Sequence, residues 1–112
     1  MAIQTITLSL ESGTTNLILT DNQGHSGTDI TTDVSPLDIV LWKIESGSAI
    51  QEITSIYRKS GSVNVFSSIP VSLPGGDWKG IVAGLASGTE QYGVKYKVDG
   101  TEYDVDPYIR VQ

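Results

Sequence analysis

The sequence predicts an all-β protein, a single antiparallel β-sandwich of the immunoglobulin-like or jelly-roll-like kind with about eight or nine short strands. Through most of the chain, apolar residues recur at every second position, which is the period of a half-buried strand. Turn-forming Gly, Pro, Asn, Asp and Ser residues interrupt this pattern at short intervals, and no stretch has a long helical period. Because 112 residues are enough for one core, residues 1–112 are expected to form one domain.

The first part of the chain contains three expected strands. Over residues 6–10, Ile and Leu alternate with Thr and Ser, and residues 15–20 are a second short run with β-branched character. Residues 21–27, DNQGHSG, have the composition of a loop. The third strand is expected at residues 30–34, and Ser35-Pro36 ends it, since proline cannot donate a hydrogen bond to a strand ladder.

The middle of the chain contains three further expected strands. Residues 38–44, DIVLWKI, are nearly continuously apolar, which is typical of a central strand covered on both faces. Residues 50–59 place isoleucines three positions apart, a spacing that a helix would also give, but their Thr and Tyr content favours a strand entered by a single helical turn. A turn and a short strand are expected at residues 60–66, a loop with two prolines at residues 67–76, and a strand at residues 77–84.

The end of the chain predicts a β-hairpin with Asp99-Gly100 as its two-residue turn. Asp-Gly is favoured in a type I′ turn, because that turn needs positive φ angles at both central positions. The resulting register pairs Val98 with Thr101, Tyr96 with Tyr103, Val94 with Val105, Lys97 with Glu102 and Lys95 with Asp104. One face of the hairpin is then apolar and aromatic, and the other carries two pairs of opposite charge. After the proline at Asp106-Pro107, a last strand is expected at residues 108–111.

Charge and residue counts argue against several classes of protein. Thirteen acidic and seven basic residues give a net charge of −6, which disfavours nucleic acids and anionic membranes as partners. No stretch approaches the ~20 apolar residues of a membrane helix, and the first residues lack the basic and apolar segments of a signal peptide. A cytoplasmic location is therefore expected, with export by another route left open. With no cysteine and one histidine, the chain cannot build a type 1 copper site or a His- or Cys-based zinc site.

From Val34 onward, the order of short motifs resembles the bacterial inclusion-body protein family of the AidA/PixA type. DVSPLDIVLWKI resembles that family's turn into a buried strand, and ITSIYRKSGSVNVF resembles its Ile/Tyr strand with the Ser/Gly turn that follows. DWKGIVAGLASGTEQYGVKYKV resembles its Trp-containing strand and Gly-Thr-Glu-x-Tyr segment, and DPYIRV resembles its ending. The resemblance implies an abundant bacterial β-sandwich without catalytic activity that tends to self-associate, with sugar binding as a further activity of the group.

The chain also departs from that family. Its members are longer, and residues 1–33 match none of their motifs. The glycine that precedes aspartate in the family's first turn is Leu37 here, and the tryptophan that precedes Asp-Pro is Val105. The resemblance covers roughly two-thirds of the chain and supplies no site residues.

His25 is the only histidine and the first candidate for catalysis. It lies beside Ser26 and near Asp21 and Asp29. A Ser-His-Asp site needs a serine held on a fixed element and separate oxyanion donors, and GHSG is one residue short of the GxSxG motif. No pair of acids is marked as the two carboxylates of a glycosidase. No catalytic residue is assigned, and the protein is expected not to be an enzyme.

The loop at residues 21–29 is the first candidate ligand site, with Asp21, Asn22, His25 and Asp29 as its polar side chains. Oxygen donors of this kind bind calcium, but the spacing is not that of an EF-hand, and solvated loop residues that form turns are the alternative. The sequence therefore assigns no metal and no cofactor.

Asp77 and Trp78 are the second candidate ligand site, because they follow two glycines at the start of an expected strand. Trp78 would stack on a sugar ring if it lay at the rim of the sandwich, or it would be a half-buried anchor of the core. Trp42 lies in the continuous apolar run and is expected in the core.

Two functions from different classes remain after these exclusions. The first is a structural, self-assembling module that forms a homo-oligomer through edge strands and flat faces. The second is a lectin-like module that binds a glycan, with or without calcium, through the two candidate loop sites.

Overall fold

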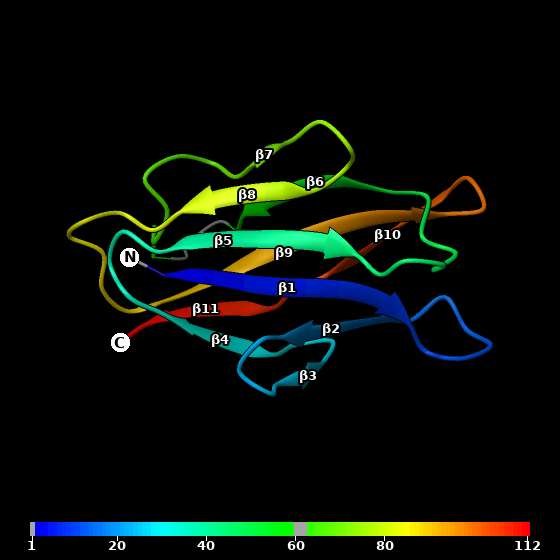
Figure 1. The fold of residues 1–112 in the computed structure, drawn as a ribbon, viewed down its shortest axis with the longest axis horizontal. Helices are drawn as coiled ribbons and strands as arrows, with labels where there is room; N and C mark the ends of the chain where they lie inside the picture. Colours follow the sequence, from blue (N-terminus) through cyan, green and yellow to red (C-terminus); the bar gives the residue numbers. More distant parts are fainter. Residues whose placement is uncertain (1, 60–62) are drawn as a thin grey trace.

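The computed structural model describes residues 2–59 and 63–112 and shows an all-β protein. Within these residues there are eleven strands in two sheets and no helix, hence none that is long and apolar enough to cross a membrane (Figure 1). The strands are β1 (Ile3–Leu10), β2 (Leu17–Asp21), β3 (Ser26–Gly27), β4 (Thr31–Val34), β5 (Ile39–Ile44), β6 (Glu52–Arg58), β7 (Val71–Ser72), β8 (Trp78–Ile81), β9 (Thr89–Val98), β10 (Thr101–Val105) and β11 (Tyr108–Val111). The expected number of strands, about eight or nine, is too low, because β3 and β7 are two-residue edge strands inside segments of loop composition.

Both sheets are mixed rather than antiparallel. The first has six strands in the order β3-β2-β1-β5-β8-β7, and β1 runs parallel to β5. In the second sheet, the long strand β9 pairs with β6 along one edge. Along its other edge β9 pairs first with β10 and then, in the same register, with β11. β4 lies parallel to β11. The prediction of an antiparallel architecture is therefore wrong for these two pairs. Each parallel pair joins strands that are distant in sequence, which local turn signals do not reveal.

The two sheets lie face to face and enclose one apolar core (Figure 1). Trp42 on β5 and Tyr92 on β9 are fully buried, and Trp42 Nε1 donates a hydrogen bond to Tyr92 Oη across 3.2 Å. The Phe66 ring centroid lies 5.8 Å from that of Trp42. A Cβ atom at Gly80 would lie 2.8 Å from Phe66 Cε1, so only glycine fits there. The prediction that Trp42 belongs to the core is confirmed.

The predicted β9–β10 hairpin is present with the predicted register. Asp99 and Gly100 have φ angles of 50° and 78°, as a type I′ turn requires. Tyr96 and Tyr103 stack with their ring centroids 5.5 Å apart. The register is therefore fixed both by the turn and by an aromatic pair on the inner face.

The charged face of the hairpin has different side-chain partners from those the register suggests. Lys95 Nζ lies 4.0 Å from Glu102 Oε1, and Glu102 is two residues along the strand from Asp104, the register partner of Lys95. Asp104 instead accepts a hydrogen bond from Tyr57 Oη on β6. The Tyr57 ring lies over Gly93, where an added Cβ would come within 2.2 Å of Tyr57 Cζ. Glycine at this position therefore lets Tyr57 cross β9 and reach β10.

Within residues 50–59, the preferred strand is present as β6 at Glu52–Arg58, and the helical alternative is wrong. A β-bulge between Ile53 and Ser55 adds one residue to β6 opposite β9. Ile53 and Ile56, which are three positions apart, therefore both face the core, at 5% and 1% exposure. The bulge is the physical reason why this strand carries a helix-like spacing.

The expected short strand at residues 60–66 is not formed over the described part, residues 63–66. Phe66 makes only a single β-bridge with Val82, and the expected turn at residues 60–62 lies outside the described residues. The strand expected at residues 77–84 is present over a shorter range as β8, with Gly80 buried, and Val82 just beyond its end is also buried. β7 lies within the loop predicted at residues 67–76 and pairs with β8.

Candidate functional site

Asp21, the first residue of the predicted loop site, faces the interior instead of the solvent. Its side chain accepts hydrogen bonds from the backbone amides of Gln23 and His25, both at 2.9 Å, and from Thr32 Oγ1 at 2.8 Å. His25 Nδ1 lies 2.8 Å from Asp21 Oδ2. Burial by itself would raise the pKa of Asp21, but these hydrogen bonds outweigh it and hold the pKa below the usual 3.8. Asp21 therefore fastens the β2–β3 turn to β4.

The other residues of that loop do not converge on one point. Asn22 Oδ1 accepts a hydrogen bond from the backbone amide of Thr5 at 3.3 Å, and Asp29 is exposed. The hydroxyl groups of Ser26 and Thr20 share a hydrogen bond of 3.3 Å. Across residues 2–59 and 63–112, no group of three or more His, Cys, Asp or Glu side chains is placed to hold a metal ion. The loop is a structural turn whose polar groups are largely bonded to the protein.

Asp77 and Trp78 are likewise bonded within the protein. Trp78 is half-buried and its Nε1 donates to the Ile53 carbonyl at 3.2 Å, and Asp77 Oδ2 lies 3.7 Å from Lys43 Nζ. Two roles were considered for Trp78, a sugar-stacking residue at the rim and a half-buried anchor of the core. Its burial and its hydrogen bond favour the second.

The structure does not bring the two predicted loop sites together. In the register of the first sheet, Asp21 pairs with Ile6, Ile6 with Trp42, and Trp42 with Trp78. Three strand spacings of about 4.8 Å separate the first and last positions, roughly 14 Å. The core residues Ile6 and Trp42 stand between them, so Asp21 and Trp78 cannot hold one small ligand.

The feature that distinguishes this molecule is the outer face of the six-stranded sheet. The outer face consists of the side chains that alternate with core residues on β1, β5, β7 and β8: Ile3, Thr5, Thr7, Ser9, Ile39, Leu41, Lys43, Val71, Lys79 and Ile81. A sheet that packs on a core through one face normally presents polar side chains on the other. Here half of the outer-face positions are aliphatic.

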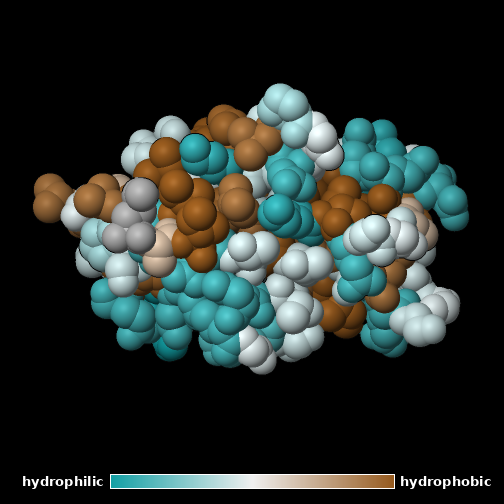
Figure 2. All heavy atoms as spheres, in the orientation of Figure 1, coloured by the Kyte–Doolittle hydropathy of each residue, from teal (hydrophilic) through white to brown (hydrophobic). Residues whose placement is uncertain are grey.

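The aliphatic side chains of the outer face are adjacent in space. Ile3 pairs with Ile39, and Ile39 pairs with Ile81, so the three lie in one row across β1, β5 and β8. Leu41 lies two residues along β5 from Ile39. Val71 on β7 lies in the same row as Leu41, with Lys79 of β8 between them. Ile3, Val71 and Ile81 are 54%, 55% and 42% exposed. Figure 2 shows hydrophobic atoms gathered on this face, over the starts of β1 and β5 and the end of β8.

Electrostatics also set the outer face apart. Its only ionisable side chains are Lys43 and Lys79, and none of its ten positions is acidic, although the chain has thirteen acids. Thr and Ser border the aliphatic row along β1. An apolar centre with a polar border is the anatomy of a protein–protein interface. One feature of the sequence indicated this apolar outer face: the DIVLWKI run at residues 38–44, which predicts a strand covered on both faces.

The comparisons with known proteins do not assign a family. No protein-family model matches the chain, and no curated protein matches it. Among solved structures, the chain is similar to a cysteine protease inhibitor from Entamoeba histolytica, with 13% sequence identity and a TM-score of 0.46 over 100% of this chain and 97% of that chain. A similarity of this size carries no conclusion about the function of the present protein.

Proposed function

We propose that this protein is a non-catalytic module, an immunoglobulin-like β-sandwich, that self-associates through the outer face of its six-stranded sheet. The supporting observation is the central strand β5. Its sequence is apolar on both faces, yet one chain covers only the face that carries Val40 and Trp42, both 0% exposed. Ile39 and Leu41 point the other way, are only half-buried and do not belong to the core cluster. The missing layer is supplied by a second chain.

The charge distribution supports a second copy of this chain as that layer. Two copies with a net charge of −6 each repel one another, and the repulsion is smallest where the acids are fewest. The outer face has no acid and two lysines. Pairing of this face with itself also follows the two-fold symmetry that is commonest among homo-oligomers. The resemblance of residues 34–112 to an inclusion-body family points in the same direction.

Light scattering after size-exclusion chromatography, over a series of protein concentrations, tests the proposal. The wild type is expected to form dimers or larger assemblies. Ile39→Glu places a charge in the middle of the isoleucine row and is expected to weaken association at least about thirtyfold, or about 2 kcal/mol. Ile81→Glu makes the same change at the end of β8, where the side chain is already 42% exposed and the fold tolerates it.

Leu85→Glu is the matched control for these variants. Leu85 is 100% exposed in the loop after β8, outside the outer face, so the same gain of charge there should leave association unchanged. Circular dichroism shows whether each variant keeps its β-structure. A wild type that stays monomeric at the highest concentration, or a Leu85→Glu variant that dissociates as readily as Ile81→Glu, would overturn the proposal.

A further inference from the structure

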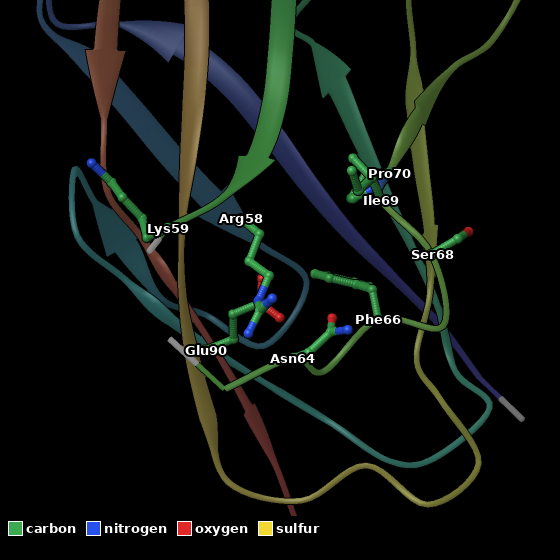
Figure 3. A pocket seen from close by; sticks show the side chains of 8 residues that line it. All are labelled: Arg58, Lys59, Asn64, Phe66, Ser68, Ile69, Pro70 and Glu90. Atoms are coloured by element: carbon green, nitrogen blue, oxygen red, sulfur yellow. The ribbon is translucent and has the colours of Figure 1, made fainter. Parts of the chain in front are cut away.

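A cavity of about 540 Å³ opens beside the core, and none of its lining residues belongs to the outer face (Figure 3). Its walls are the end of β6, the segment before β7 and one residue of β9. The lining residues are Arg58, Lys59, Asn64, Phe66, Ser68, Ile69, Pro70 and Glu90. Cavities that bind small molecules have volumes of about 300–1,000 Å³, so this one has room for a ligand.

Glu90 is the unusual side chain of this pocket. It is a carboxylate on β9 with only 2% of its surface exposed, and Glu90 Oε1 accepts a hydrogen bond from the Val65 backbone amide at 2.7 Å. Burial raises the pKa of Glu90, and the Val65 amide and the charge of Arg58 partly offset that rise. In Figure 3 the Arg58 and Glu90 side chains lie toward one another. The pocket therefore contains a fixed acceptor and a guanidinium donor close together.

The positive charges around the pocket are already balanced. Lys59 points away from Glu90 in Figure 3, and its Nζ lies 2.7 Å from Asp106 Oδ1. The Arg58 charge faces the Glu90 carboxylate. An anionic ligand would have to displace these two carboxylates from their cations, and a cationic ligand would meet both cations. The electrostatics of the pocket therefore favour an uncharged ligand.

The rest of the pocket wall combines an amide with apolar surfaces. Asn64 is exposed and its amide, which both donates and accepts, lies beside Glu90 and Arg58 in Figure 3. Ile69 and Pro70 form the opposite side, while Phe66 extends toward Arg58 beside Asn64. Ile69 is 67% exposed although it is a large aliphatic residue. Hydroxyl groups suit the polar side, because each one donates to a carboxylate and accepts from a guanidinium or amide. C–H groups suit the apolar side.

We propose that this pocket binds an uncharged, hydroxyl-rich molecule with one apolar side, of the size of one or two sugar rings. In this arrangement Glu90 and Asn64 accept hydrogen bonds from ligand hydroxyls, Arg58 donates to them, and the ring C–H groups lie against Ile69 and Pro70. The site shares no residue with the loop positions that the sequence suggested for glycan binding. It is also independent of self-association through the outer face.

Amide NMR of the ¹⁵N-labelled protein tests this assignment. The probes are methyl α-glucopyranoside, methyl β-galactopyranoside, N-acetylglucosamine and maltose, with benzoate and benzylammonium as charged probes of similar size. At least one sugar should shift the Val65 backbone amide, which reports on Glu90, and the side-chain amide of Asn64. The charged probes should shift these signals less. If no sugar moves them, or if benzoate or benzylammonium moves them more than every sugar does, the assignment is wrong.

Two variants check that the pocket itself is responsible. Asn64→Ala removes an exposed amide and should weaken sugar binding about fivefold, the effect of one lost hydrogen bond. Glu90→Gln keeps an oxygen for the Val65 amide but removes the charge, and it should weaken binding as well. Asn16→Ala, an exposed asparagine in the β1–β2 loop, is the matched control and should bind as the wild type does. Equal binding by Asn64→Ala and wild type would overturn the proposal.

The same titration in the Ile81→Glu variant separates this site from the interface. Ile81 does not line the pocket, so sugar binding should be unchanged in that variant whatever its state of association. Loss of sugar binding in Ile81→Glu would place the ligand at the outer face and refute the pocket.

Discussion

A single buried polar residue can hold two segments of this protein together through hydrogen bonds. Asp21 is the clearest case: it is 5% exposed and receives hydrogen bonds from Gln23, His25 and Thr32. These donors come from the β2–β3 turn and from β4, which belong to different sheets. Composition alone places Asp21 in a solvated loop, because an aspartate beside Asn and Gly is usually a turn former. Only the hydrogen-bond partners reveal its structural role.

Asp21→Asn is expected to lower the free energy of unfolding at neutral pH by about 2–3 kcal/mol, since an amide cannot accept all of these hydrogen bonds. Because the folded-state pKa of Asp21 is lowered, its contribution is present above the usual value of 3.8 and is lost as the pH falls through the folded-state pKa. Urea unfolding at a series of pH values measures both effects. The difference between the variant and the wild type should therefore shrink in strong acid.

Asp29→Asn is the control for this prediction, because Asp29 is exposed in the same segment and should change stability by only a few tenths of a kcal/mol. A difference between Asp21→Asn and wild type that stayed constant from neutral pH into strong acid would contradict the assigned role of the carboxylate.

At the scale of elements, β9 organises the second sheet. Its ten residues pair with β6 along one edge and with β10 and then β11 along the other. One register serves both β10 and β11, with the Tyr92 amide bonded to the Pro107 carbonyl between them. The two-residue turn at Asp99-Gly100 therefore sets the position of two strands, not one.

Gly100→Ala is expected to destabilise the protein by about 1–2 kcal/mol. A Cβ atom at Gly100 would meet nothing within 4 Å, so the cost comes from its φ angle of 78° and not from a clash. Gly84→Ala is the control, because Gly84 has no positive φ and an added Cβ would only touch Leu37 at 3.5 Å. Thermal unfolding should separate the two variants, and equal melting temperatures would show that the turn does not fix the register.

At the scale of the whole molecule, charge and apolar surface are separated. The acids avoid the ten positions of the outer face, while the chain as a whole carries −6. The cavity beside Glu90 lies elsewhere and is lined by balanced charges. The two proposals therefore concern different surfaces: self-association the outer face, and ligand binding the cavity beside Glu90.

Self-association should strengthen with salt. Long-range repulsion between two acidic copies extends about 30 Å at about 0.01 M salt and about 3 Å at about 1 M, whereas apolar contact on the outer face is not screened. Sedimentation velocity in sodium chloride across this range is expected to show a larger assembled fraction at higher salt. An assembly that came apart as salt was added would instead indicate an interface held by ion pairs, and the ten outer-face positions include no acid that could pair with the lysines of a second copy.

Local sequence determined much of this protein. The period of two predicted most of the strands and their inward residues, and Asp99-Gly100 predicted the hairpin register, because both depend on the backbone geometry of neighbouring residues. Where a β-bulge intervened, the local pattern was ambiguous: the bulge in β6 gave Ile53 and Ile56 a spacing that a helix would also give, although the residue types still favoured the strand that forms.

Tertiary structure decided the rest. The parallel pairs β1–β5 and β4–β11, the burial of Asp21 and the convergence of Arg58, Asn64 and Glu90 all join residues distant in the chain. No local signal carries such contacts, because they depend on how the two sheets are ordered and packed. The apolar run of β5 needed both levels: its sequence predicts cover on both faces, and the fold covers only the face that carries Val40 and Trp42. A second chain over the other face is our proposal.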